Sequence, residues 1–399
     1  MDYSNVNCPS WISTKIEKAG GVVSFHSFMD MVLNDPVNGY YGSGQLRIGE
    51  SGDFVTSPSL GPEFASLLSK EIINWLLQLQ SINEFDYPLS LIEIGPGEGT
   101  FSYDLLNSIE EIDPELLTKI DLILVEKNIG MEKRQRDLFS HFSKIKVKWS
   151  TLEELSKNPV FGIVIANEVL DALPVERIIY HNKILYRQGV KVVKNSNINK
   201  LEFVRLPIHK LIEDTLEQIE KNLGVQIPPN IAEDGWCSEL HVSIKPWFEM
   251  VSKCLINGAI LVIDYALEAK RYYTSHRNDG TLISYKDQEA ISNFMLNPSN
   301  SDLTSHLCLE MVELDAKSIG LKLIGNTRQG QALLALGLAD KFYDLQSQYI
   351  NDLAKALKSR ESLLRLVDPL GLGEFRWMAF QVEKQSRKLT LQTKFLQSP

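Results

Sequence analysis

The chain has 399 residues, enough for two or three domains or for one large α/β domain with insertions. Its 44% hydrophobic and 23% charged residues are typical of a globular protein and exclude a collagen-like or wholly disordered chain. The formal charge of −10, from 41 Lys and Arg against 51 Asp and Glu, argues against nucleic acid as a partner. The apolar runs are shorter than the ~18 residues of a membrane-spanning helix, so we expect no membrane insertion.

The cysteines and histidines show none of the spacings of a metal site. The four cysteines lie far apart without a Cys-x-x-Cys pair, and no two of the seven histidines are spaced His-x-x-x-His. We therefore expect no bound metal and a reducing compartment. The first 21 residues have neither a secretory apolar stretch nor the Arg-rich, acid-poor pattern of a mitochondrial presequence, which predicts a cytoplasmic protein.

In chain order, apolar runs alternate with segments of helical periodicity. Helices are predicted at 64–79, 100–109 and 244–255, and buried strands at 89–94, 122–125, 144–149, 161–166 and 259–265. This alternation predicts a doubly wound, Rossmann-like α/β sheet with helices on both faces. Two last strands, at 321–324 and 332–338, are expected to pair as a hairpin, and 341–366 to form an amphipathic helix.

Two segments fall outside this alternation. The first 85 residues form an N-terminal extension, helical apart from a Gly-, Ser- and Pro-rich loop over 39–61, and residues 177–206 alternate apolar and polar side chains as antiparallel hairpins do. We therefore divide the chain into an N-terminal extension with a lid (1–85), the first part of the core (86–176), an inserted antiparallel β and helical subdomain (177–235), the second part of the core (236–340) and a C-terminal helix and strand (341–399).

The strongest motif is Glu-Ile-Gly-Pro-Gly-Glu-Gly at residues 93–99, between the first core strand and its helix. Glycines there let the backbone turn sharply and approach a ligand at the helix start. The dinucleotide fingerprint needs glycine at the position of Thr100, so NAD is disfavoured. A carboxylate two residues before the first glycine is the arrangement that S-adenosylmethionine methyltransferases use, and the Glu93 side chain suits the methionine ammonium.

Two further strand ends carry polar side chains. Glu126 ends the 122–125 run at the distance where a carboxylate meets ribose hydroxyls in such folds, although an exposed strand-end acid fits equally well. The strand at 161–166 is followed by Asn167, Glu168 and Asp171, and the two acids would share a face if the chain entered a helix there. Asp171 could equally be a helix cap.

Taken together, these motifs resemble the MidA-type S-adenosylmethionine-dependent methyltransferases, whose relatives include a mitochondrial complex I assembly factor. The resemblance covers about residues 20 to 380. Its motifs are Phe28-Met29, Asn34-Asp35-Pro36, Gly39-Tyr40-Tyr41, residues 52–58, Asn167-Glu168, residues 171–174, Glu239, Trp247, residues 263–265, residues 280–282, residues 302–306, Gln331 and residues 333–337. Ala266 replaces the usual glycine after Asp264-Tyr265, and 297–301 lacks an expected glycine, so substrate-side loops are where this chain departs from the pattern.

The resemblance implies a class I methyltransferase fold, S-adenosyl-L-methionine as cofactor, and a protein arginine as acceptor. Carboxylates would then orient the protonated guanidinium, with Glu168 and Asp171 as the catalytic candidates and Asp53 and Glu239 as further ones. The expected cofactor-binding residues are Glu93, Gly95, Gly97, Gly99, Glu126, Asn167, Asp53, Thr56 and Pro58. Residues 39–64 are expected to close over the cofactor as a lid.

The acceptor implied by the resemblance belongs to an arginine-bearing subunit of a larger complex, and a homodimer is compatible with the sequence. Two other functions stay open: a cofactor-binding assembly chaperone without turnover, and a small-molecule methyltransferase.

Overall fold

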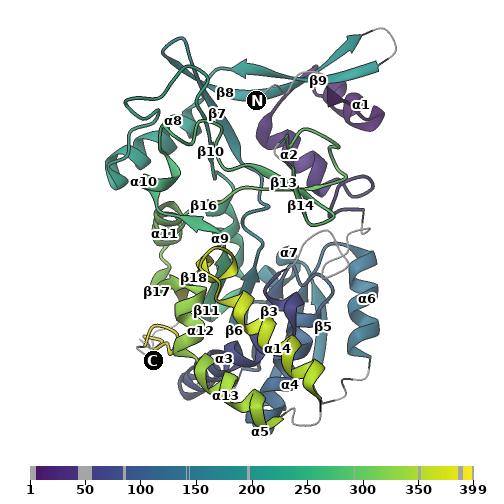
Figure 1. Cartoon of the computed structure of the whole chain (residues 1–399), viewed down its shortest axis with the longest axis vertical. Helices are drawn as coiled ribbons and strands as arrows, with labels where there is room; N and C mark the ends of the chain where they lie inside the picture. The colour runs from purple at the N-terminus through teal and green to yellow at the C-terminus, as the bar shows by residue number, and fades with distance from the viewer. Residues whose placement is uncertain are drawn as a thin grey trace. The chain divides into compact units, whose positions relative to one another are not determined.

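The computed structural model describes residues 6–43, 56–83, 87–140, 142, 144–195, 198–291, 293–348, 352–384 and 390–397 (Figure 1). The chain divides into two compact units, each assembled from separate stretches of sequence. Residues 47–169, 247–265 and 316–399 form what we call the parallel-sheet unit, and residues 1–46, 170–246 and 266–315 form the antiparallel-sheet unit. In the described parts of the chain, no helix is both long enough and apolar enough to cross a membrane.

The parallel-sheet unit is built on seven described strands in the order β17-β18-β11-β6-β3-β4-β5. Strands β5, β4, β3, β6 and β11 are parallel to one another, whereas β18 runs antiparallel to both β11 and β17. The strands are β3 (Leu89–Ile94), β4 (Ile120–Val125), β5 (Lys146–Ser150), β6 (Val160–Asn167), β11 (Leu255–Asp264), β17 (Lys322–Arg328) and β18 (Arg376–Glu383). The predicted doubly wound α/β sheet is confirmed.

The strand order reverses between β3 and β6. From β3 the chain adds β4 and then β5 on one side, and it returns to place β6 on the other side of β3. Ligands of open α/β sheets bind at such a reversal, beyond the carboxyl ends of the strands. The segments after Ile94 and after Asn167 therefore start at the favoured ligand position of this sheet.

Helices cover both faces of the sheet because the central strands are apolar on both sides. Leu91, Ile163 and Leu261 belong to one hydrophobic core with α3, α4, α12 and α14, whereas Ile92 and Val164 point to the opposite face and are also fully buried. The helices of this unit are α3 (Glu63–Ile82), α4 (Thr100–Ile112), α5 (Pro114–Leu117), α6 (Ile129–Phe139), α7 (Leu152–Lys157), α12 (Gln329–Ala335), α13 (Leu338–Gln348) and α14 (Leu353–Leu366), with short 3-10 turns at Pro58–Leu60 and Leu372–Glu374. Helices α9 (Ile244–Lys253) and α11 (Leu309–Ser318) begin in the other unit.

The antiparallel-sheet unit centres on a sheet in the order β1-β9-β8-β7-β10, with β2 paired to β8. The hairpins expected at 177–206 are present as β7, β8 and β9. The N-terminal helices α1 and α2 belong to this same unit. Its elements are β1 (Val6–Asn7), α1 (Ser10–Lys18), β2 (Val22–Ser24), α2 (Phe25–Asn34), β7 (Glu176–His181), β8 (Ile184–Asn195), β9 (Ile198–Leu206), α8 (Lys210–Gln218), a π-helical turn (Ile219–Leu223), β10 (Cys237–Leu240), β12 (Ala266–Leu267), α10 (Ala269–Tyr272), β13 (Ile283–Lys286), β14 (Glu289–Ile291), β15 (Asp302–Thr304) and β16 (Leu307–Cys308).

Three sequence expectations differ from the structure. The run at 332–338, expected as a strand, covers the end of α12, the turn after it and the first residue of α13, and β17 pairs with β18 rather than with that run. A short apolar run does not distinguish a buried helix from a buried strand, which explains the error. The helix expected over 341–366 is divided between α13 and α14. The sequence predicted a core in two parts around an insertion at 177–235, whereas in the structure residues 1–46 and 266–315 also join the unit that contains this insertion.

Candidate cofactor site

The glycine loop follows β3 at the point where the strand order reverses. Gly95, Gly97 and Gly99 all have positive φ angles, of 66°, 55° and 82°, a left-handed backbone that favours glycine. A Cβ atom on Gly95 would lie 3.1 Å from Cγ2 of Val169, and one on Gly99 would lie 3.3 Å from Cγ of Gln135. The motif therefore needs glycine for its turn and for its close packing against the segments that follow β4 and β6.

Glu93, the carboxylate before the loop, is buried in the sheet. Its Oε2 accepts a hydrogen bond from the Ser102 hydroxyl in the first turn of α4. Burial raises the pKa of the Glu93 carboxyl to about 8, an effect that the Ser102 hydrogen bonds reduce and the charge of Glu126 reinforces. A nearby ammonium group would favour the ionised carboxylate, so the position suits the end of the cofactor expected there.

Glu126 directly follows β4, and two donors hold its carboxylate. The backbone N–H of Asn128 donates to Oε1 at 2.8 Å, and Nε2 of Gln135 donates to Oε2 at 3.1 Å. Burial raises the pKa of this carboxyl group, which the same donors counteract. The carboxylate is thus fixed on its strand end rather than free in solvent, contrary to the alternative of an ordinary exposed acid.

Asn167 is the last residue of β6, the strand beside β3, and Glu168 directly follows it. Glu168 has a φ of 53°, a strained conformation for a residue with a side chain, and its Oε1 accepts hydrogen bonds from Nδ2 of Asn167 at 3.1 Å and from the backbone N–H of Ser57 at 3.3 Å. Oδ1 of Asn167 is buried, and no hydrogen-bond partner for it is found among the described residues. A buried acceptor without a donor is the feature that a bound ligand would satisfy.

The segment before α3 contributes Thr56, Ser57 and Pro58. Thr56 and Ser57 are buried, Thr56 is tied to Ser59 through its N–H and C=O, and Pro58 opens the 3-10 turn. Asp53 and the middle of the expected lid, residues 44–55, lie outside the described residues, so the site role of Asp53 and lid closure stay predictions. The assignments of Thr56 and Pro58 to cofactor binding stay predictions.

Asp171 and Glu239 lie in the antiparallel-sheet unit. The chain forms a turn rather than a helix after Asn167, so the argument that Glu168 and Asp171 share a helix face is wrong, and Asp171 caps no helix. Asp171 is buried in its own unit. In that unit the Tyr41 hydroxyl donates to Oδ1 of Asp302 at 2.6 Å, and burial together with the charges of Asp302 and Asp171 raises the pKa of Tyr41 well above its usual value.

Glu239 is fully buried in the same unit. Its Oε2 accepts the Thr281 N–H at 2.8 Å, and its Oε1 lies 3.6 Å from Nε of the buried Arg177. These partners place Glu239 in the core of its unit. Its Oε1 makes no hydrogen bond among the described residues, so the assignment of Glu239 to acceptor binding stays a prediction.

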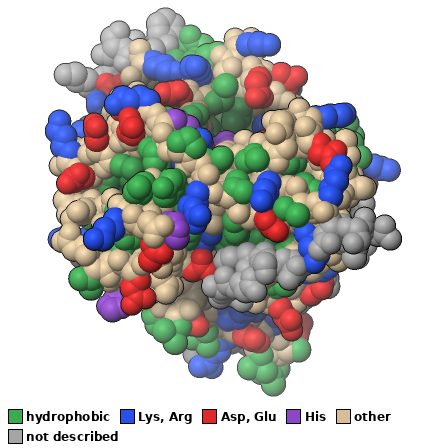
Figure 2. Space-filling view, turned by 90° about the horizontal axis from the view of Figure 1, so that it is seen from above, with side chains coloured by type: hydrophobic (Ala, Val, Ile, Leu, Met, Phe, Trp, Pro, Cys, Tyr) green, Lys and Arg blue, Asp and Glu red, His purple; other side chains and the backbone are tan. Residues whose placement is uncertain are grey.

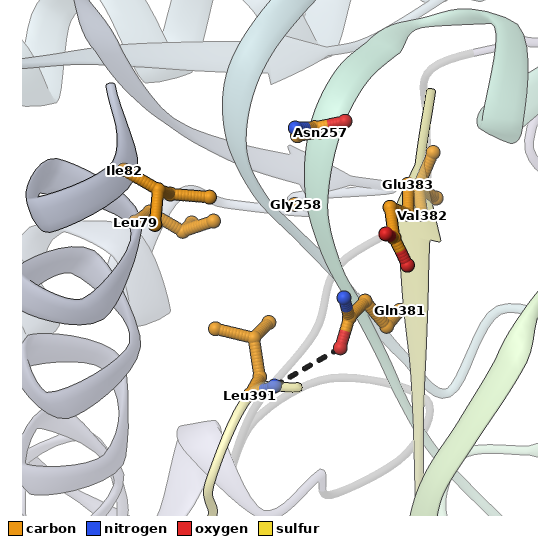
Figure 3. Close-up of a pocket in the computed structure, with 8 residues that line it drawn as sticks. All are labelled: Leu79, Ile82, Asn257, Gly258, Gln381, Val382, Glu383 and Leu391. Atoms are coloured by element: carbon orange, nitrogen blue, oxygen red, sulfur yellow. Dashed lines mark hydrogen bonds between the residues drawn. The ribbon is translucent and has the colours of Figure 1, made fainter. Parts of the chain in front are cut away.

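The recess shown in Figure 3 is separate from this site. It lies where β11 begins and β18 ends, at the amino ends of the parallel strands, whereas the glycine loop lies at their carboxyl ends. Its lining is mainly apolar and consists of Leu79, Ile82, Asn257, Gly258, Gln381, Val382, Glu383 and Leu391. The described residues also hold no group of three or more His, Cys, Asp or Glu side chains arranged for a metal ion.

Four side chains around the site were not predicted from the sequence: Ser57, Ser102, Gln135 and Gln329. Ser57 bonds Glu168 through its N–H, and its hydroxyl lies 3.1 Å from Nε2 of the buried Gln329. Ser102 holds Glu93, and Gln135 holds Glu126. Two of them had a positional signal, since Ser57 lies within the 52–58 motif and Ser102 lies three residues past the last glycine. Gln135 and Gln329 are brought in by packing.

Comparisons with known proteins agree with this geometry. Residues 67–327 match the family model described as "Putative S-adenosyl-L-methionine-dependent methyltransferase". The chain is 23% identical over 381 residues to the rat protein named protein arginine methyltransferase NDUFAF7, mitochondrial, covering 90% of this chain and 80% of that protein. The zebrafish protein of that name is 24% identical over 393 residues, covering 92% and 85%.

Among solved structures, a Burkholderia thailandensis protein bound to S-adenosyl-homocysteine superposes with a TM-score of 0.80. It is 24% identical, and the match covers 99% of this chain and 98% of that one. This similarity supports the class I methyltransferase fold. The glycine loop, the anchored Glu126 and the unsatisfied Asn167 are features that fit S-adenosyl-L-methionine. Because the family model matches more than half of the chain, the chain belongs to this family of S-adenosyl-L-methionine-dependent methyltransferases.

Proposed function

We propose that this methyltransferase modifies the guanidinium group of an arginine side chain in a protein. The proposal rests on the geometry of Glu168. This residue has a strained backbone at the strand end beside the glycine loop, and its carboxylate is held by a hydrogen bond from the Ser57 N–H. Strained positions persist where the surrounding structure enforces them, and they cluster in functional sites. The names of the similar mitochondrial proteins support an arginine acceptor.

The chemistry asks two things of the chain's own residues. When bound, the cofactor supplies an electrophilic methyl group on a sulfonium sulfur. A guanidinium is protonated at neutral pH and carries only donors, so a carboxylate is the group that can hold it in a fixed orientation. Ser57 and Asn167 hold the Glu168 carboxylate in place before the acceptor arrives. Glu168 is then the group positioned to take the proton that the guanidinium loses for each methyl gained. Such positioning accounts for a large part of the rate in a displacement reaction.

The surface is compatible with a protein acceptor. Acidic and basic side chains are intermixed over the face in Figure 2, and the net charge of the chain is −10. A cationic arginine segment would be attracted by this balance, whereas a polyanion would be repelled. Asp171 stays a second catalytic candidate in the antiparallel-sheet unit, and we propose a subunit of a larger complex as the acceptor's source.

Isotope-labelled methyl transfer tests the proposal. The protein is incubated with deuterated-methyl S-adenosylmethionine and a protein extract, and hydrolysates are analysed for methylarginines by mass spectrometry. Glu168→Gln should lower turnover at least ~100-fold while the Kd for S-adenosylhomocysteine stays within about threefold, because the lost interaction orients the acceptor. Glu361→Gln, an exposed carboxylate on α14, is the matched control and should leave turnover unchanged.

Each other outcome identifies a different function. Cofactor binding without any labelled product would indicate an assembly protein that binds the cofactor without turnover. Label recovered only in small molecules would indicate a small-molecule methyltransferase. Loss of cofactor binding in a folded Glu168→Gln protein would move Glu168 from the acceptor side to the cofactor side of the site.

A further inference from the structure

One buried amide joins three elements of the cofactor site. Gln135 lies on α6 and is fully buried. Its Nε2 donates to the backbone oxygen of Gly97 at 2.7 Å and to Oε2 of Glu126 at 3.1 Å, while its Oε1 accepts from Nε1 of Trp149 at 2.9 Å. The glycine loop and the ends of β4 and β5 therefore share one side chain.

The indole of Trp149 determines which way this amide faces. An indole N–H can only donate, so it must meet the amide oxygen, and the amide NH₂ must then point toward the opposite side. Both of its N–H groups have an acceptor there, one in Gly97 and one in Glu126. The amide is thus fully hydrogen-bonded in one orientation. Rotating it by 180° would place its oxygen against the oxygens of Gly97 and Glu126, and its NH₂ group against the N–H of Trp149.

Packing adds a second connection between α6 and the glycine loop. A Cβ atom on Gly99 would lie 3.3 Å from Cγ of Gln135 and 3.3 Å from Cε2 of Phe139, so the loop lies directly on α6. Nε of Arg134 also donates to Glu98 of the loop at 2.9 Å. Helix α6 is therefore a platform that holds the loop, and Gln135 is its buried contact with the carboxylate.

We propose that Gln135 is a positioning residue that orients the Glu126 carboxylate relative to the glycine loop and so sets the affinity for the ribose of the cofactor. The inference rests on the assignment of the glycine loop and Glu126 to S-adenosylmethionine. Gln135 acts through these two groups. Its removal leaves Glu126 with one fewer donor and lets the carboxylate and the loop move independently.

A double-mutant cycle measured by calorimetry with S-adenosylhomocysteine tests the proposal. Gln135→Leu, similar in size but without donors, should raise the Kd about tenfold or more in the wild-type background. In the Glu126→Ala background, where there is no carboxylate to orient, the same change should raise the Kd no more than about threefold. With the 2′,3′-dideoxyribose analogue of S-adenosylhomocysteine, Gln135→Leu should likewise have less than a threefold effect.

Two further variants separate positioning from general damage. Gln381→Leu removes another buried amide of this unit, in β18 near the amino ends of the parallel strands and so at the other end of the sheet from the glycine loop. It should lower stability without changing the Kd for S-adenosylhomocysteine. Trp149→Phe removes the donor that orients Gln135 and should raise the Kd at least about threefold, which keeps the test available if Gln135→Leu does not fold.

Contrary outcomes are specific. An equal loss of affinity in both backgrounds, or with both ligands, would show that Gln135 only maintains the fold of the unit and would overturn the proposal. An unchanged Kd in folded Gln135→Leu would overturn it as well. If the wild-type protein did not bind S-adenosylhomocysteine, the cofactor assignment would fail together with this inference, whereas absence of arginine methylation alone would leave the inference standing.

Discussion

At the scale of single residues, burial raises the pKa values of the carboxyl groups of Glu93 and Glu126 in the parallel-sheet unit. Glu93 is in the interior, where its ionised form loses hydration, and Glu126 lies close enough to reinforce the effect. The pKa of Glu93 rises from its ordinary value of 4.5 to about 8, so the folded protein favours the protonated acid. The sequence placed Glu93 beside a ligand, but its preference for a proton follows from the fold.

This shift predicts a pH-dependent stability. Since the pKa is raised on folding, the contribution of Glu93 is complete below about pH 4.5 and is lost as the pH rises towards 8. The side chain of Glu93→Gln is neutral at every pH. Between pH 5 and 8, the free energy of unfolding of the cofactor-free wild type should therefore fall by at least about 1.4 kcal/mol more than that of the variant. Urea unfolding at several pH values measures this.

The control for this prediction is Glu361→Gln, since Glu361 is exposed on α14. Its stability should follow the pH profile of the wild type. Identical profiles for Glu93→Gln and the wild type would contradict a raised pKa at Glu93.

At the scale of elements, glycines decide how closely the strands and loops approach. A Cβ atom on Gly162 of β6 would lie 1.9 Å from the Ser90 backbone oxygen of β3, and one on Gly258 of β11 would lie 1.8 Å from the backbone oxygen of Gly162. The three central strands thus contact one another through backbone at this level. The sequence indicated strands here, but it gave no sign that these glycines mark close contacts.

The glycine loop provides a matched pair of substitutions. Gly99 and Gly320 have similar φ angles, 82° and 89°, but a Cβ atom on Gly99 would press against α6, whereas one on Gly320 would meet nothing within 4 Å. Both alanine variants should lose ~1–2 kcal/mol of stability from the left-handed backbone. Only Gly99→Ala should also raise the Kd for S-adenosylhomocysteine, by about tenfold, because it displaces the loop from α6.

Calorimetric titration and thermal unfolding of both variants check this expectation. Equal cofactor affinities for Gly99→Ala and Gly320→Ala would mean that the contact between the loop and α6 has no part in binding.

At the scale of the whole molecule, each unit has its own buried polar centre. In the antiparallel-sheet unit, Arg177 and Glu239 are fully buried, and Arg177 also donates to Oε1 of Gln188 at 2.6 Å and pairs with Asp279. The Arg177 guanidinium lies 5.1 Å from the ring centre of Phe294. Charges in such an environment depend on their partners, because removing one leaves the other without compensation.

Arg177→Met should therefore destabilise the protein by ~3 kcal/mol or more, because it leaves Glu239 buried without its cation. Glu239→Gln should cost less, since Asp279 still pairs with Arg177, and the combined cost should be smaller than the sum of the two. The Kd for S-adenosylhomocysteine should change less than about threefold at temperatures where the variants are folded. A Glu239→Gln protein of unchanged stability but reduced turnover would instead make Glu239 an acceptor-binding residue. Denaturant unfolding and the labelled-methyl assay distinguish the two cases.

The homodimer and the cytoplasmic location stay predictions.

The sequence by itself determined the parallel sheet and the cofactor loop of this protein. Both are local patterns: apolar runs of strand length such as 161–166, and glycines at 95, 97 and 99 whose spacing reflects backbone geometry within one turn. The carboxylates Glu93, Glu126 and Glu168 were also found in the sequence, because each lies within a few residues of a strand end.

Only the tertiary structure decided the partners of these groups and the fate of the ambiguous segments. Gln135 meets Gly97 and Glu126 through a fold that brings α6 onto the glycine loop, and no spacing in the chain encodes that contact. The run at 332–338 became helical, and Glu239 proved to be a core partner of Arg177. An apolar run or a lone carboxylate fits several environments equally well, and which environment it receives depends on side chains that are distant in sequence.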